Sequence, residues 1–99
     1  MAELRGASTE YTLDTVSMQV DNPDLDLAAA RTLAKARARD MDGNAMMLSY
    51  HSGKTGESWP SDACGGSGRP PWIVFAEARG YNLKIDINNG EYEFFYLRF

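Results

Sequence analysis

The chain has 99 residues, of which 43% are hydrophobic and 11% aromatic, and its formal net charge is −4. This composition fits one folded domain and excludes a disordered chain, which would hold too few apolar residues to build a core. The acidic balance argues against general nucleic-acid binding, because neutralised phosphates supply most of the affinity in such complexes.

The single cysteine cannot form an internal disulfide, which favours a reducing compartment. The first residues lack the apolar run of a signal peptide, and no stretch reaches the roughly 18 apolar residues needed to span a bilayer. We therefore expect a cytoplasmic protein that makes no contact with a membrane.

Residues 1–9 show no periodicity, and we expect a flexible N-terminus followed by one domain over residues 10–99. Between Glu10 and Val20 the chain is rich in Thr, Val and Tyr, and its apolar residues alternate with polar ones after Asp14. This alternation predicts a strand with one buried face, which either bulges near Asp14 or begins after it.

A helix is predicted over residues 25–41, with Asn22 as its cap and Pro23 in its first turn. At 100° per residue its apolar side chains share one broad sector, which we expect to face the core. This sector contains Leu27, Ala30, Leu33, Ala34, Ala38 and Met41. Arg31, Lys35 and Arg39 fall together outside it.

Residues 45–51 predict a second strand, with Met46, Leu48 and Tyr50 on one face and Met47, Ser49 and His51 on the other. A Gly-, Ser- and Pro-rich segment, residues 52–71, follows as a long loop. The two prolines before Trp72 and the glycine at position 80 predict a short helix between them. The run Ile73-Val74-Phe75 also permits a strand there.

Asn89-Gly90 is the strongest short signal for a two-residue hairpin turn. Counting outward from it pairs Ile87 with Tyr92, Ile85 with Phe94 and Leu83 with Tyr96, all on one face. The predicted fold is therefore a single two-layer α+β domain of order β-α-β-α-β-β. Its mixed four-stranded sheet would carry the helices on one face and end in the hairpin.

The segment from Cys64 to Arg69 carries the clearest chemical signal of the loop. A thiol, four small residues, an arginine and a helix start resemble, over these six residues, the active loops of cysteine-dependent phosphatases and sulfurtransferases. The spacing is closer to the rhodanese loop. The resemblance implies an oxyanion held by loop amides and Arg69. Independently of it, His51 is a candidate base for the Cys64 thiol.

Three loop residues, Lys54, Ser67 and Arg69, are candidates for binding a small anionic ligand. One histidine and one cysteine leave too few ligands for a metal site, and no motif indicates a cofactor. No stretch matches a motif of a characterised family, so we expect an uncharacterised one.

The charge is uneven, because residues 1–30 carry −5 and residues 31–54 carry +3. The stripe of Arg31, Lys35 and Arg39 therefore keeps weak nucleic-acid binding open as an alternative, although it also suits a solvated helix face. Phe95, Leu97 and Phe99 point away from the predicted core and would form an exposed apolar patch, which favours a homodimer.

These observations favour a non-catalytic, homo-oligomeric binding module with a partner or a small anionic ligand near the loop. A small cysteine-dependent enzyme using Cys64 is the alternative from a different class.

Overall fold

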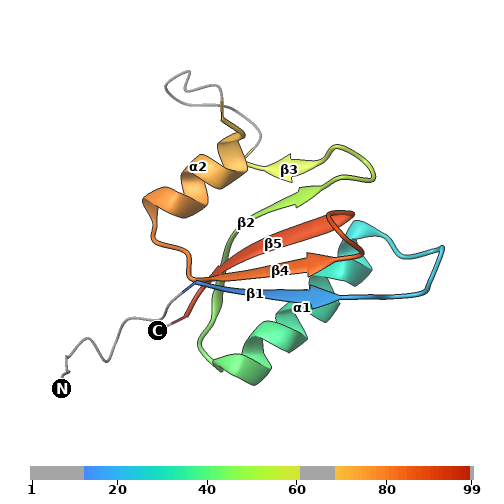
Figure 1. Cartoon of the computed structure of the whole chain (residues 1–99), viewed down its shortest axis with the longest axis horizontal. Helices are drawn as coiled ribbons and strands as arrows, with labels where there is room; N and C mark the ends of the chain where they lie inside the picture. The colour runs from blue at the N-terminus through green and yellow to red at the C-terminus, as the bar shows by residue number, and fades with distance from the viewer. Residues whose placement is uncertain (1–12, 61–68, 99) are drawn as a thin grey trace.

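The computed structural model describes residues 13–60 and 69–98, in which two helices pack against a five-stranded mixed sheet (Figure 1). The elements are β1 (Asp14–Met18), α1 (Leu27–Met41), β2 (Met46–Ser52), β3 (Ser58–Trp59), α2 (Pro71–Ala78), β4 (Leu83–Ile87) and β5 (Tyr92–Leu97). The strands lie in the order β1-β4-β5-β2-β3. The α+β class is confirmed. Within the described ranges, no helix is long and apolar enough to cross a membrane.

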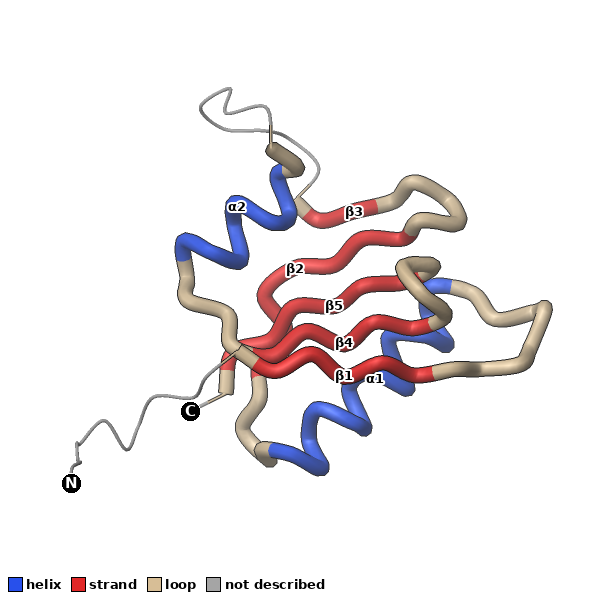
Figure 2. The backbone as a smooth tube through the Cα atoms, in the orientation of Figure 1, coloured by secondary structure: helices blue, strands red, loops and turns tan. Residues whose placement is uncertain are grey.

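The C-terminal hairpin occupies the centre of the sheet (Figure 2). Its predicted register is confirmed, because Ile87 pairs with Tyr92 and Ile85 with Phe94. The chain turns through Asn88, Asn89 and Gly90, which have φ values of 56°, 54° and 92°. Asparagine and glycine are the residues that tolerate this left-handed backbone, so the local chemistry fixes the register.

The crossover through α1 joins two strands that run in the same direction but are not neighbours. β1 is parallel to β4, while β2 is antiparallel to β5, and β5 is antiparallel to β4. The two hairpin strands therefore lie between β1 and β2 in the sheet. The sequence pattern does not reveal this order.

The main core lies between the hairpin and α1, which runs behind the sheet in Figure 1. Three alanines one turn apart, Ala30, Ala34 and Ala38, are fully buried against the apolar face of β4 and β5. Small side chains let the helix approach the sheet closely enough to seal the aromatic residues beneath it. Leu33, predicted to face this core, is 36% exposed.

The prediction that both helices lie on one face is wrong, because α2 packs against the face opposite α1. The Ser49 hydroxyl donates to the carbonyl of Trp72 at 2.8 Å, and the His51 ring stacks on the Trp72 ring. Ser49 and His51 pair with Phe95 and Glu93, whose side chains alternate with the α1-facing Phe94. β5 therefore has large apolar side chains on both faces, with Phe94 toward α1 and Phe95 on the side of α2.

A bulge in β2 overturns the predicted alternation of that strand. The register shifts between Met47, which pairs with Tyr96, and Ser49, which pairs with Phe95. Leu48 is the extra residue, so Met47 and Tyr50 both pack against the α1-side core. A β-bulge changes which face each later side chain occupies, and no turn signal marks it in the sequence.

Two further predictions are corrected at element boundaries. The sheet has five strands rather than four, because Ser58 and Trp59, inside the predicted loop, pair with β2 as β3. Asp26, not Asn22, caps α1 by accepting from the Ala29 amide at 2.8 Å. Asn22 instead accepts from the Asp24 amide in the preceding turn.

The close approach of α1 to the sheet predicts the effect of enlarging a buried alanine. Ala34→Leu should lower the free energy of unfolding by about 1–3 kcal/mol, because the fully buried site has no room for the added methylenes. Ala36→Leu, at an exposed position of the same helix, is the control and should change it by less than about 0.5 kcal/mol. Urea unfolding of both variants checks this, and equal effects at the two sites would contradict the packing described.

Burial of the hairpin tyrosines predicts how stability depends on alkaline pH. Burial raises the pKa of Tyr96 to about 12, although the charges of Arg31 and Arg39 oppose the shift. An unfolded tyrosine has a pKa of about 10. The contribution of Tyr96 to the free energy of unfolding is therefore complete below that pH and is lost as the pH rises to about 12. Two pKa units correspond to roughly 2–3 kcal/mol.

Tyr96→Phe should therefore lose less stability than the natural chain between these pH values, as measured by urea unfolding across the range. Parallel curves for the two proteins would show that Tyr96 does not carry this dependence.

Candidate functional site

A basic groove runs between α1 and the start of β2, and it is the candidate site. Arg31, Lys35 and Arg39, the predicted stripe, form its helix wall, while Ala45, Met46, Met47 and Tyr96 form its floor. The hollow has a volume of about 310 Å³. No Asp or Glu is among the described residues that line it. Three exposed cations and no lining carboxylate give this groove a local excess of positive charge.

The cations line the groove because of how α1 is seated on the sheet. The alanine face packs over β4 and β5, so the helix side carrying the stripe turns toward β2 rather than away from the protein. The Arg31 guanidinium lies over the Tyr50 ring, with its central carbon 4.9 Å from the ring centre. Such a cation–π contact restrains the position of the arginine.

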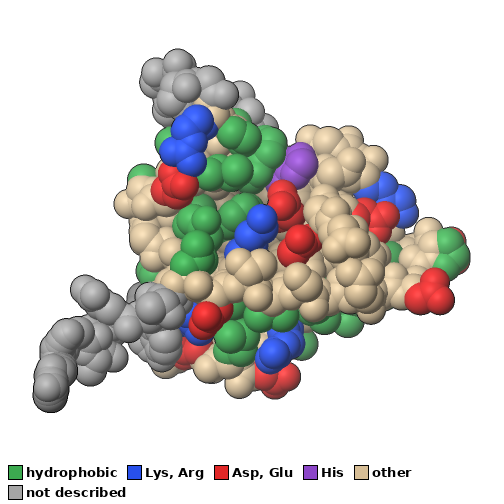
Figure 3. Space-filling model, viewed as in Figure 1, with side chains coloured by type: hydrophobic (Ala, Val, Ile, Leu, Met, Phe, Trp, Pro, Cys, Tyr) green, Lys and Arg blue, Asp and Glu red, His purple; other side chains and the backbone are tan. Residues whose placement is uncertain are grey.

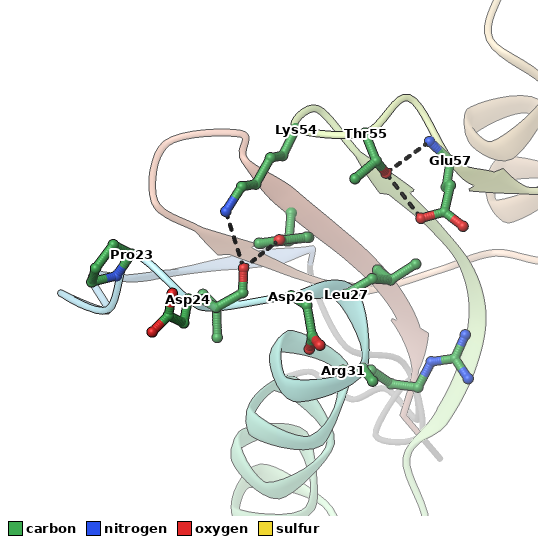
Figure 4. Close-up of a pocket in the computed structure, with 11 residues that line it drawn as sticks. Pro23, Asp24, Asp26, Leu27, Arg31, Lys54, Thr55 and Glu57 are labelled. Atoms are coloured by element: carbon green, nitrogen blue, oxygen red, sulfur yellow. Dashed lines mark hydrogen bonds between the residues drawn. The ribbon is translucent and has the colours of Figure 1, made fainter.

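A second hollow adjoins the basic groove at Arg31, which lines both (Figure 4). It has a volume of about 540 Å³ and lies between the start of α1 and the turn that joins β2 to β3. The Lys54 ammonium and the Tyr92 hydroxyl both donate to the Leu25 carbonyl, at 3.2 Å and 2.9 Å, and hold these two segments together. The rim carries three carboxylates, those of Asp24, Asp26 and Glu57.

This second hollow, the acidic cleft, differs in charge from the basic groove. Burial raises the pKa of the Tyr92 phenol, and the nearby carboxylates of Glu91, Asp26 and Glu57 raise it further. Asp26 is engaged as the helix cap, which places negative charge where a bound anion would otherwise sit on the helix end. The acidic cleft therefore suits groups that donate hydrogen bonds.

The face opposite α1 carries His51 in a polar cluster (Figure 3). Its Nδ1 lies 3.5 Å from a Glu93 oxygen, and the Lys84 ammonium holds the other Glu93 oxygen at 3.0 Å. The His51 and Trp72 rings are parallel, with centres 4.1 Å apart. Within the described parts of the chain, His51 Nδ1 and Trp72 Nε1 are buried without a hydrogen bond. His51 thus stacks on Trp72 beside the Lys84–Glu93 ion pair, and a nucleophile beside it is not among the described residues.

The predicted loop residues do not gather into one described site. Cys64 and Ser67 lie outside the described residues, so their proposed roles as nucleophile and anion ligand stay predictions. Arg69 pairs with Glu77 of α2 at 2.7 Å, and this contact lowers the pKa of the Glu77 carboxyl. Lys54 lies instead in the acidic cleft. Among the described residues, no group of three His, Cys, Asp or Glu side chains is placed to hold a metal ion.

Part of the predicted apolar patch is covered by the segment that follows α2. The expectation that Phe95 is exposed is wrong, since it is 2% exposed and meets the Tyr81 ring edge-on at 5.1 Å. Leu97 is half-buried, and Phe99 lies outside the described residues. Self-association through this face stays a prediction that rests on the last two residues.

The sequence revealed the cations of the basic groove but not its floor. Arg31, Lys35 and Arg39 were found from helical spacing alone. The contribution of Met46, Met47 and Tyr96 depends on the position of α1 over the sheet and on the bulge at Leu48, neither of which has a local signal.

Comparison with known proteins agrees with this architecture. An uncharacterised protein of Archaeoglobus fulgidus is 44% identical over 52 residues, which cover 52% of this chain and 55% of that protein. The chain thus matches about half the length of that curated relative. The crystal structure of protein AF1514, also from Archaeoglobus fulgidus, is similar with a TM-score of 0.74 and 32% identity, over 88% of this chain and 95% of the other.

A family model described as "Domain of unknown function (DUF5619)" matches residues 13–96, which include every helix and strand named above except the last residue of β5. The expectation of an uncharacterised family is confirmed. The match covers both walls of the basic groove and of the acidic cleft. The chain therefore belongs to the DUF5619 family.

Proposed function

We propose that this protein is a non-catalytic binding module whose ligand is a small polyanion held in the basic groove. The observation that carries the proposal is the set of three cations, Arg31, Lys35 and Arg39, in a hollow whose described lining contains no carboxylate. Charged donors that surround a groove without internal counter-charges gain free energy when an anion supplies the missing charge.

The spacing of the cations indicates an extended ligand. Four helical residues rise about 6 Å, so the stripe is a row of about 12 Å along α1. One tetrahedral anion contacts only one end of such a row, whereas a chain of phosphates or carboxylates contacts all three side chains. The floor of Met46 and Met47 supports the same proposal, because it offers apolar contact and no competing charge.

We place the ligand in the basic groove rather than at the loop, where the sequence predicts Lys54 and Arg69 as anion ligands. Arg69 is paired with Glu77, and Lys54 donates to a backbone carbonyl. The basic groove also offers a narrow form of the nucleic-acid alternative, since the same row suits a phosphate backbone. The net charge of −4 favours the small ligand, because long-range repulsion opposes a nucleic acid more than a short anion.

Charge reversal in the groove tests the proposal. Lys35→Glu combined with Arg39→Glu should weaken the binding of inorganic triphosphate at least tenfold, because charge-assisted hydrogen bonds contribute about 1.5–3 kcal/mol each. Arg37→Glu, an exposed charge reversal on the same helix but outside the groove, is the control, and it is compared with Lys35→Glu alone because both change the net charge by two units. Isothermal titration calorimetry at low and moderate salt measures the affinities.

The natural protein and the Arg37→Glu control should bind triphosphate alike, with affinity falling as salt rises. A loss in the control as large as in Lys35→Glu alone would assign binding to overall charge rather than to the groove. Tight binding of a single-stranded oligonucleotide with no measurable triphosphate binding would favour the nucleic-acid alternative.

A further inference from the structure

The basic groove and the acidic cleft share one lining residue, Arg31. Its guanidinium lies over the Tyr50 ring, with the central carbon 4.9 Å from the ring centre. The volumes of about 310 Å³ and 540 Å³ both lie within the size range of small-molecule sites. A ligand that reaches from one hollow to the other must pass Arg31.

The lining of the acidic cleft favours a ligand group whose chemistry differs from that of a phosphate chain. Its walls include Pro23 and Leu27, which offer apolar contact to a flat group. Asp24 and Glu57 add carboxylate oxygens at the rim, which accept hydrogen bonds from hydroxyl and amino groups. The Lys54 ammonium, which donates to the Leu25 carbonyl (Figure 4), and Arg31 offset two of the three carboxylate charges, so the lining keeps a formal charge of −1.

We propose that the ligand is a nucleoside polyphosphate, with its phosphates along Arg31, Lys35 and Arg39 and its nucleoside in the acidic cleft. This inference rests on the proposed function of the basic groove. A nucleoside supplies what the cleft lacks, since its ribose hydroxyls and base amino groups are donors and its base is flat and largely apolar. Carboxylates are common partners of ribose hydroxyls in nucleotide sites. A simple chain of phosphates would fill the basic groove and leave the acidic cleft without a partner.

The test compares two ligands with the same phosphate chain. Adenosine triphosphate and guanosine triphosphate are titrated against inorganic triphosphate at equal ionic strength by calorimetry. At least one nucleotide should bind the natural protein tenfold or more tightly than inorganic triphosphate. The difference measures what the nucleoside adds in the acidic cleft.

Neutral substitutions in the cleft locate that difference. Asp24→Asn with Glu57→Gln should reduce nucleotide affinity to the level of inorganic triphosphate, while triphosphate affinity stays equal or rises because two negative charges are removed. Asp40→Asn, on α1 but outside both hollows, is the control and should leave both affinities unchanged. Circular dichroism melts verify that each variant is folded.

The results separate the two proposals. If inorganic triphosphate binds and depends on Lys35 and Arg39, but neither nucleotide binds more tightly, the nucleoside assignment is wrong and the anion-binding function stands. If no triphosphate of any kind binds, both are wrong. A folded cleft variant that keeps the full nucleotide preference also overturns the inference, because the carboxylates then contribute nothing to recognising the nucleoside.

Discussion

The central position of the β4–β5 hairpin is the constraint on which the rest of the structure depends. An asparagine side chain makes a pair of backbone hydrogen bonds at each end of the hairpin. Asn88 exchanges side-chain hydrogen bonds with the backbone of Val20, at 2.8 Å and 3.1 Å, and so ties the turn to the chain after β1. At the other end, buried Asn82 bonds the amide and carbonyl of Arg98 at 2.8 Å and 3.2 Å. Buried polar groups satisfied in this way stabilise one arrangement of strands, since any slip would leave them unpaired.

The position of the hairpin also determines where α1 lies and thus what its cations can do. Because the alanine face must cover the aromatic residues of the two central strands, the helix cannot move toward β2. A gap remains above β2, bounded by the cationic side of the helix and floored by residues at the bulge. The basic groove is therefore a consequence of core packing, in which a helix with a narrow apolar face covers only part of a wide sheet.

The two faces of the sheet have different physical characters. Between α1 and the hairpin the contacts are apolar and fully buried, whereas the α2 side mixes Phe95 with the ion pair of Lys84 and Glu93. Lys84 also offsets the repulsion between Asp86 and Glu93, which face each other across β4 and β5. The Asp86 carboxylate is further engaged by the Gly90 amide in the turn. Hence the charges on the α2 side of the sheet are paired with one another, whereas the described lining of the basic groove contains three cations and no carboxylate.

Interactions between residues close in the sequence determined the hairpin register and the two faces of α1. Asn89-Gly90 set the turn and the register of six hairpin residues, while helical spacing identified the buried alanines and the cationic stripe. These features depend on neighbours within a few positions, where backbone preference and side-chain period act directly. Only the tertiary structure decided the order of the strands, the bulge at Leu48, the burial of Phe95 and the meeting of two hollows at Arg31. Each of these features depends on contacts between segments that are distant in the sequence. Such contacts form only when the whole chain packs.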